Sequence, residues 1–177
     1  MVYKLDVDNL AGLSVEEVKN QINSSYKKPL RELKLFDLLL NEQCDSAMRH
    51  GIYMFFNESN ECLYTGMCSS SHFAHRIGGH FGMSPKYGMN TFLKRIVKDL
   101  NPSTKTSYSH YVEALAKISG YGLLMINTNG KSKAFIRALE KAIHITFKPR
   151  LNFPKGFPET YKNIKNTNDF MSNLPPK

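Results

Sequence analysis

Five side chains are of types that can take part in acid–base or charge-based chemistry: Tyr53, Tyr64, Arg76, His80 and Glu140. Arg76 and His80 lie four residues apart, so they share one face of a helix if the helical turn persists through them. Arginine presents a fork of donors that matches phosphate oxygens. Glu140 is expected at the rim of an apolar helix face, where a carboxylate is half desolvated but still reachable by water and ions. Such chemistry depends on elements that bring these groups together.

Two short β-prone segments are predicted to pair as a hairpin. Gly51–Phe56 and residues 61–66 flank a four-residue polar turn. Pairing across this turn places Tyr53 directly opposite Tyr64, and opposed residues project from the same face of a sheet. The spacing therefore predicts two tyrosines side by side, unless a bulge or a one-residue slip shifts the register.

The remaining elements of this region are expected to be mainly helical. Residues 71–79 predict a short helix, and residues 90–100 predict an amphipathic one. Residues 121–126 are typical of a buried strand. A strong helix is predicted over 132–147, ended by Pro149. We therefore expect an α+β fold, with a small antiparallel three-stranded sheet flanked by helices.

The charge of the chain is unevenly distributed. The 24 Lys and Arg residues exceed the 15 Asp and Glu residues, for a net charge of +9. Residues 1–48 nevertheless contain six basic and eight acidic side chains. This division predicts an N-terminal extension (1–48), a basic body (49–153) and a basic C-terminal tail (154–177). A basic body indicates a polyanionic partner.

The N-terminal extension is expected to be helical. Ser14 and Glu17 form a capping-box pattern at the start of a first helix. Apolar residues recur at helical spacing over 30–40, which predicts a second, amphipathic helix after Pro29. Such a pair normally packs on a neighbour, so we expect a packing or dimer-forming role more than a chemical one.

The cysteines and the apolar runs indicate the compartment. The N-terminus has no signal-peptide pattern, and no apolar run approaches the ~18 residues of a membrane span. Cys44, Cys62 and Cys68 are odd in number, which favours reduced thiols in a cytoplasmic protein without membrane contact. With His72 and His75, two of these cysteines leave a zinc site open, although the spacings match no common zinc motif.

The ordered set of motifs resembles the GIY-YIG nuclease superfamily over roughly residues 49–153. The residues that carry this resemblance are Gly51-Ile52-Tyr53, Tyr64-Thr65-Gly66, Arg76, Glu140 and Asn152. The pair Arg76 and His80 resembles the Arg-x-x-x-His spacing in some restriction enzymes of the superfamily. Two departures stand out, because Thr65 replaces the usual isoleucine and Met67 stands where many members have a lysine. Lys86 and Lys94 are the candidates to replace that lysine.

The resemblance implies a phosphodiesterase site that uses a divalent metal ion. Glu140 would hold Mg²⁺, with Mn²⁺ as a possible substitute, because Mg²⁺ accepts one protein carboxylate with water and phosphate completing its coordination. Arg76 would hold the non-bridging phosphate oxygens. The implied catalytic set is Tyr53, Tyr64, Arg76, His80, Glu140 and Asn152.

The other members of this set have less definite implied roles. Tyr53 would activate or position the attacking water, for which its pKa of ~10 would need lowering by nearby cations. His80 would either accept a proton from Tyr53 or contact phosphate. Tyr64 would form a hydrogen bond in the site, and Asn152 would brace the Glu140 region or touch DNA.

These implications predict a metal-dependent DNA endonuclease acting on double-stranded DNA, in particular a homodimeric, site-specific type II restriction enzyme. The alternatives are a structure-specific or mobile-element nuclease, and a non-catalytic DNA-binding module on the same scaffold. The presence of both tyrosines, Arg76 and Glu140 argues against the last. The candidate DNA-binding cations are Lys86, Lys94, Lys98, Lys131, Lys133, Arg150 and Lys155.

Overall fold

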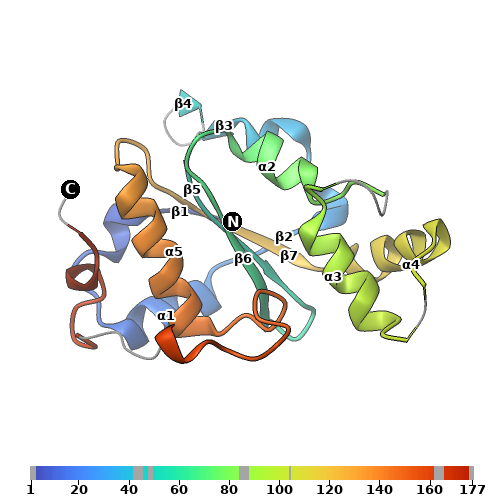
Figure 1. The fold of residues 1–177 in the computed structure, drawn as a ribbon. Coiled ribbons are helices and arrows are strands. Elements are labelled where there is room, and N and C mark those ends of the chain that lie inside the picture. The colour runs from blue at the N-terminus through green and yellow to red at the C-terminus, as the bar shows by residue number, and fades with distance from the viewer. Residues whose placement is uncertain are drawn as a thin grey trace.

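A mixed five-stranded sheet forms the centre of the protein, as the computed structural model shows (Figure 1). The residues that the structure describes are 3–41, 46–47, 50–83, 88–103, 105–161 and 166–175. Four strands follow one another in the order β1-β7-β5-β6, and β2 also pairs with β7.

β5 (Gly51–Phe56) lies in the middle of the sheet. It pairs antiparallel with β6 (Cys62–Cys68) on one side and with β7 (Gly122–Asn127) on the other. β7 in turn pairs in parallel with β1 (Lys4–Asp6) and antiparallel with the short β2 (Lys28–Pro29). β5 and β7 are buried along their whole length, as expected for continuous apolar runs covered on both faces. β6 stands last in the strand order and so forms one edge of the sheet.

Helices cover both faces of this sheet (Figure 1). α1 (Val15–Ser24) and α5 (Lys133–Phe147) pack on one face. α2 (Phe73–Gly79), α3 (Thr91–Leu100) and α4 (Tyr108–Ile118) lie on the other. The two layers of helices sandwich β5 and β7, which is why both strands are apolar throughout.

The alternation of side chains along β5 divides the core into two clusters. Tyr53 and Phe55 point to the face covered by α2, α3 and α4. Ile52, Met54 and Phe56 point to the face covered by α1 and α5. All five side chains are at most 1% exposed. Successive residues of a strand face opposite sides, so a single strand anchors both layers.

Several short elements complete the fold. A two-stranded sheet pairs β3 (Leu40–Asn41) with β4 (Ser46–Ala47). The 3-10 helices are η1 (Val7–Leu10), η2 (Leu30–Glu32), η3 (Leu35–Leu38), η4 (Glu159–Tyr161) and η5 (Met171–Asn173). None of the described helices is long and apolar enough to cross a membrane.

Most of the predicted local elements are confirmed. The elements expected over 71–79, 90–100, 121–126 and 132–147 are found as α2, α3, β7 and α5. The capping box at the start of α1 is also present: the Ser14 Oγ accepts the Glu17 N–H at 3.2 Å, and the Glu17 Oε2 accepts the Ser14 N–H at 2.7 Å. These elements are specified by patterns within a few residues of each other.

The prediction of a three-stranded antiparallel sheet is wrong. Two further strands come from the first 48 residues, with Lys4 opposite Met125 in the parallel pair and Lys28 opposite Leu123 in the antiparallel pair. These residues therefore belong to the sheet and are not only a helical extension. Strands of three and two residues are too short to show a period, and their pairing partners lie about a hundred residues away in sequence.

The second predicted helix, over 30–40, is also wrong. This segment forms the 3-10 turns η2 and η3 instead. Pro29 pairs with β7, and Leu30 and Arg31 donate their backbone N–H groups to the carbonyls of Tyr121 and Ser119, so the backbone is committed to the sheet margin. The apolar side chains of this segment therefore do not share one buried face: Leu38 is buried, whereas Phe36 is 68% exposed.

Candidate active site

The two motif tyrosines lie on the same face of the β5–β6 hairpin, but not directly opposite each other. Tyr53 pairs with Gly66, and Tyr64 pairs with Phe55. The predicted register is therefore wrong, because an irregularity after Phe55 shifts the pairing. The total shift is two residues, which returns each side chain to its expected face. The two rings are diagonal neighbours, with centroids 6.4 Å apart and planes inclined by 29°.

Glycines allow the close packing around Tyr53. A Cβ atom at Gly66 would lie 2.2 Å from the Tyr53 Oη and 2.3 Å from its Cζ, so the phenol occupies the space that a side chain would take. At Gly51, a Cβ atom would lie 1.9 Å from the Ile126 carbonyl oxygen. Both distances are shorter than any real contact. The two motif glycines are therefore required by close approach within the sheet.

His80 fixes the hydroxyl of Tyr53. Its Nε2 lies 2.6 Å from the Tyr53 Oη, and its Nδ1 accepts the backbone N–H of Phe92 at 3.3 Å. Burial lowers the pKa of His80 to about 3, with further lowering from Arg76 and Arg95. The ring is thus neutral, and because Nδ1 is an acceptor, the proton lies on Nε2 and is donated to Tyr53.

This geometry bears on both roles implied for His80. The residue directly follows the end of α2, and only 2% of it is exposed. A nitrogen that donates to Tyr53 is not placed to accept that tyrosine's proton. A direct phosphate contact would need exposed surface that His80 lacks. The structure instead places it as a support for Tyr53.

Burial keeps both tyrosines neutral. It raises the pKa of Tyr53 strongly and that of Tyr64 as well, and in each case Arg76 opposes the rise. The Arg95 guanidinium lies over the Tyr64 ring, 5.5 Å from its centroid, and also lowers the Tyr64 pKa. Nearby cations lower these pKa values by less than burial raises them. The pKa of Tyr53 is therefore above its usual value of ~10, not below it.

Glu140 lies on the opposite side of the edge strand β6, on α5. Burial raises the pKa of its carboxyl to about 7. Arg76 and the backbone N–H of Met67, which donates to the carboxylate, oppose this rise. The side chain remains partly accessible, as expected for a residue at the rim of the apolar helix face. Glu140 is therefore a carboxylate that titrates near neutrality beside a cation.

Asn152 holds α5 against the free edge of β6. Its Oδ1 accepts the Thr65 N–H at 2.8 Å, and its Nδ2 donates to the Thr65 carbonyl at 2.7 Å. Leu151 continues this ladder by donating its N–H to the Leu63 carbonyl at 3.0 Å. The carboxamide thus satisfies both free peptide groups of one edge residue, as a neighbouring strand would. Of the two implied roles, Asn152 has the bracing one.

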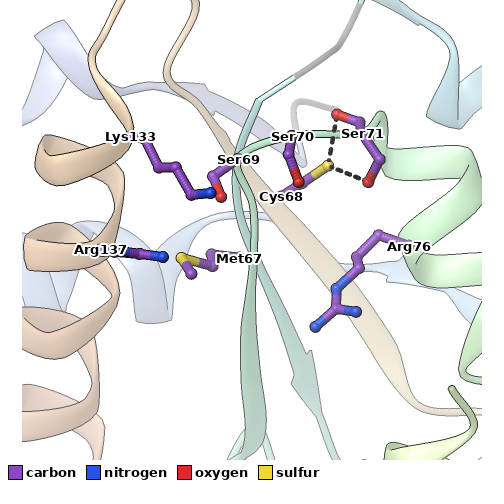
Figure 2. Close-up of a pocket in the computed structure, with 8 residues that line it drawn as sticks. All are labelled: Met67, Cys68, Ser69, Ser70, Ser71, Arg76, Lys133 and Arg137. Atoms are coloured by element: carbon purple, nitrogen blue, oxygen red, sulfur yellow. Dashed lines mark hydrogen bonds between the residues drawn. The ribbon is translucent and has the colours of Figure 1, made fainter. Parts of the chain in front are cut away.

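Arg76 is the shared neighbour of the candidate residues. It is exposed on α2, and its charge lowers the pKa of Tyr53, Tyr64 and Glu140. Figure 2 shows its side chain extending from α2 toward the space over β6, across from the cations of α5. Both tyrosines, Arg76 and Glu140 are therefore within electrostatic range of each other, although they come from four different elements.

A pocket of about 260 Å³ lies beside this group (Figure 2). Its lining residues come from the end of β6, the following loop, α2 and α5: Met67, Cys68, Ser69, Ser70, Ser71, Arg76, Lys133 and Arg137. The sequence analysis identified Arg76 and Lys133 but missed Arg137. The signal was available, since Arg137 precedes Glu140 by three residues on one helix and such residues are neighbours on its surface.

A second pocket, of about 570 Å³, gathers other predicted DNA-binding cations. Lys98, Arg150 and Lys155 line it together with Arg95, which the sequence analysis did not select. Arg150 is already paired there, because it makes two hydrogen bonds, of 2.6 and 2.9 Å, to the Asp99 carboxylate.

Of the remaining candidates, Lys131 and Lys94 line neither pocket. Lys131 is 9% exposed and lies 2.7 Å from the Asp8 carboxylate, so its charge is neutralised inside the protein. Lys94 is half-buried on α3. Lys86 lies outside the described residues.

The side chains around Glu140 suit a magnesium site better than a zinc site. The described residues contain no group of three or more His, Cys, Asp or Glu side chains that could hold a metal ion. The alternative zinc site fails for a further reason, since Cys62 and Cys68 belong to opposite core clusters. A single half-desolvated carboxylate open to water suits Mg²⁺, which keeps several waters when bound to proteins.

Comparisons with known proteins identified no relative of this chain. No protein-family model matches the chain, and neither curated proteins nor solved structures show significant similarity to it. The functional argument therefore rests on the geometry of the site.

Proposed function

We propose that the protein is a divalent-metal-dependent DNA endonuclease of the GIY-YIG type that hydrolyses phosphodiester bonds. The observation that carries this proposal is the convergence of Tyr53, Tyr64, Arg76 and Glu140 on one edge strand. Arg76 acts electrostatically on all three of the others. A packing role would explain each residue alone, but it would not require an exposed arginine and a half-buried carboxylate beside two buried hydroxyls.

Glu140 is the residue that would hold the metal ion. A bound Mg²⁺ would supply Lewis-acid stabilisation of the phosphate and of the leaving oxygen. With a pKa of about 7, the carboxyl is partly ionised near neutral pH, and a bound cation would favour the ionised form further, as Arg76 does. Asn152 keeps the carboxylate in place by tying the chain after α5 to Thr65 of β6.

Arg76 would bind the non-bridging oxygens of the scissile phosphate. Its guanidinium is exposed and faces the open space over β6 (Figure 2). A fork of donors directed at developing phosphate charge is the largest contribution that a single side chain of this site offers.

The tyrosines would position water as neutral hydroxyls. Tyr53 has no exposed surface and receives a hydrogen bond from His80, whereas Tyr64 keeps a small exposed area. We therefore assign the direct contact with water to Tyr64 and its support to Tyr53. This assignment changes the role implied by the superfamily, in which the first tyrosine activates the water.

Within the nuclease class, a type II restriction enzyme acting on double-stranded DNA fits best. Cutting both strands of a duplex favours a homodimer with two equivalent sites. The exposed Leu35 and Phe36 of η3, 62% and 68% accessible, provide apolar surface that a second copy could cover. A cytoplasmic location accords with the free thiols of Cys62 and Cys68. A structure-specific or mobile-element nuclease is the nearest alternative.

The test is the variant Glu140→Ala, with Glu16→Ala on the exposed first turn of α1 as the matched control. Plasmid DNA is incubated with each protein and Mg²⁺, and binding to a DNA duplex is measured separately in Ca²⁺. We expect Glu140→Ala to bind but not cut, and the control to match the unaltered protein. Discrete product bands support restriction, and a smear supports a less specific nuclease. Full activity of Glu140→Ala would refute the assigned metal ligand.

A further inference from the structure

The pocket between α2 and α5 is strongly cationic. Arg76, Lys133 and Arg137 line it, and no acidic side chain is among its lining residues. None of the salt bridges found within the described part of the chain involves these three cations. Glu140 interacts with Arg76 but is not among the lining residues. The three cations outnumber this one carboxylate and repel each other, so an anion in the pocket would relieve their repulsion.

The placement of the α5 cations is unfavourable for the protein alone. Lys133 and Arg137 are four residues apart on α5, where like charges destabilise a helix. Lys133 is also the first residue of α5, at the positive end of the helix dipole, where acidic residues are preferred. Both features become favourable if a negatively charged group occupies the pocket.

The pocket also offers neutral donors and sufficient room. The hydroxyls of Ser69, Ser70 and Ser71 contribute to its wall. Its volume of about 260 Å³ exceeds the ~30 Å³ share of one liquid water severalfold, so a hydrated phosphodiester group fits. In Figure 2 the side chains of Lys133 and Arg137 extend from α5 toward Ser69 and Met67.

The pocket adjoins the proposed catalytic group through two shared residues. Arg76 lines the pocket and acts on Glu140, and Met67 lines the pocket while its N–H donates to that carboxylate. Met67 itself brings no charge, and Arg137 of α5 points toward it (Figure 2). A phosphate in this pocket would therefore lie next to the one held by Arg76.

We propose that this pocket binds a second, uncleaved phosphate of the DNA backbone, adjacent to the scissile one, through Lys133, Arg137 and the serine hydroxyls. This inference rests on the proposed nuclease function. It assigns to α5 the positive charge that Met67 does not provide on β6.

The test is the double variant Lys133→Gln/Arg137→Gln. Its matched control is Arg31→Gln/Lys105→Gln, which removes the same charge from exposed positions that line neither pocket. Affinity for a 20-base-pair duplex of mixed sequence is measured in EDTA over a series of salt concentrations. Each lost phosphate contact reduces the slope of log affinity against log salt by about 0.9. We expect binding to weaken at least tenfold, the slope to fall by about 1 for the one phosphate lost, and the affinity of the control to change less than threefold.

Thermal melting of the same proteins separates binding from folding. The double variant should melt at the same temperature as the unaltered protein or higher, because two repelling cations are removed. An unchanged slope with normal folding would overturn the phosphate site. Equal weakening in the control variant would also overturn it, by reducing the effect to net charge. Since cleavage does not enter these measurements, a protein that binds in this way but never cuts would refute the nuclease proposal alone.

Discussion

The two sides of the edge strand β6 differ in how burial acts on their functional groups. On the side of α2 and α3, Tyr53, Tyr64 and His80 are at most 6% exposed. Burial raises the pKa values of both tyrosines and lowers that of His80 to about 3, so all three are neutral. We call these three residues the aromatic side. On the side of α5, Glu140 has a pKa of about 7 and Arg137 is exposed.

From this difference in burial we infer that the two sides of β6 have different roles in the proposed site. The aromatic side is part of the hydrophobic core, so it contributes stability and holds its hydroxyls at fixed positions. We call Glu140, Lys133 and Arg137 the ionic side. Lys133 and Arg137 face Arg76 across the pocket, and Glu140 interacts electrostatically with Arg76. Changes on the aromatic side should therefore reduce stability, whereas changes to the charges should alter function with little loss of stability or with a gain.

After the loss of cleavage expected for Glu140→Ala, the largest expected effect is that of removing Arg76. In the variant Arg76→Ala, the cleavage rate should fall 10² to 10³-fold, the usual cost of removing one donor that stabilises charge in the transition state. The melting temperature should change by less than about 2 °C, because Arg76 is exposed. Single-turnover cleavage and thermal melting are measured together. If Arg76→Ala lost much of its stability but cleaved DNA at the normal rate, Arg76 would act in folding and not in cleavage, which would contradict the proposed difference between the two sides.

The next effect tests the packing of the aromatic side. Gly66→Ala places a methyl group 2.2 Å from the Tyr53 Oη, and the buried ring has no room to move away. We expect a loss of about 3 kcal/mol in the free energy of unfolding, typical of overpacking in a dense core. The control is Gly78→Ala on α2, where an added Cβ has no neighbour within 4 Å. That change should stabilise the protein by up to about 1 kcal/mol, since alanine favours helix. Urea denaturation that ranks the two variants in the opposite order would contradict this packing.

Glu140 should make the folded protein less stable as pH rises. Its pKa is about 7 in the folded state, above the ordinary glutamate value of 4.5, so the unfolded state loses this proton first. Stability from this group therefore declines between about pH 4.5 and pH 7 and then stays constant. Without metal, Glu140→Gln should exceed the unaltered protein in stability by about 2 kcal/mol at pH 8, and by less at pH 5. Denaturation in EDTA that shows no such difference between the two pH values would mean that Glu140 is not desolvated.

The smallest effect concerns the second pocket, where Arg150 is paired with Asp99. Asp99→Asn should cost under about 1 kcal/mol, because both side chains are more than a third exposed. It should also release Arg150 for phosphate and raise DNA affinity two- to threefold, as measured by fluorescence anisotropy. Weaker binding by Asp99→Asn would show that the pair holds Arg150 in a binding position.

The sequence predicts those parts of the site that depend on the regular spacing of side chains within one helix or strand. Helix α5 has 15 residues of regular apolar spacing, enough to place Glu140 at its rim. Tyr53 and Tyr64 remained on one face despite a register shift of two residues, because strand side chains alternate with a period of two.

The parts that the sequence did not reveal depend on contacts distant along the chain. The hydrogen bond of His80 to Tyr53 spans 27 residues, and that of Asn152 to Thr65 spans 87. The irregularity after Phe55 has no local signal. The spacing of Arg137 from Glu140 was visible in the sequence, but the placement of Arg137 across one pocket from Arg76 was not. Periodicity fixes which face a residue takes, but not which distant group it meets there.

The central claim is tested most directly by incubating supercoiled plasmid with the unaltered protein, in Mg²⁺ and in EDTA. We expect Mg²⁺ to give linear product with ends at defined sequences, and EDTA to leave the plasmid supercoiled while DNA binding persists. Binding with no cleavage in Mg²⁺ or Mn²⁺, over pH 6 to 9, would contradict the nuclease and leave a DNA-binding module on this scaffold.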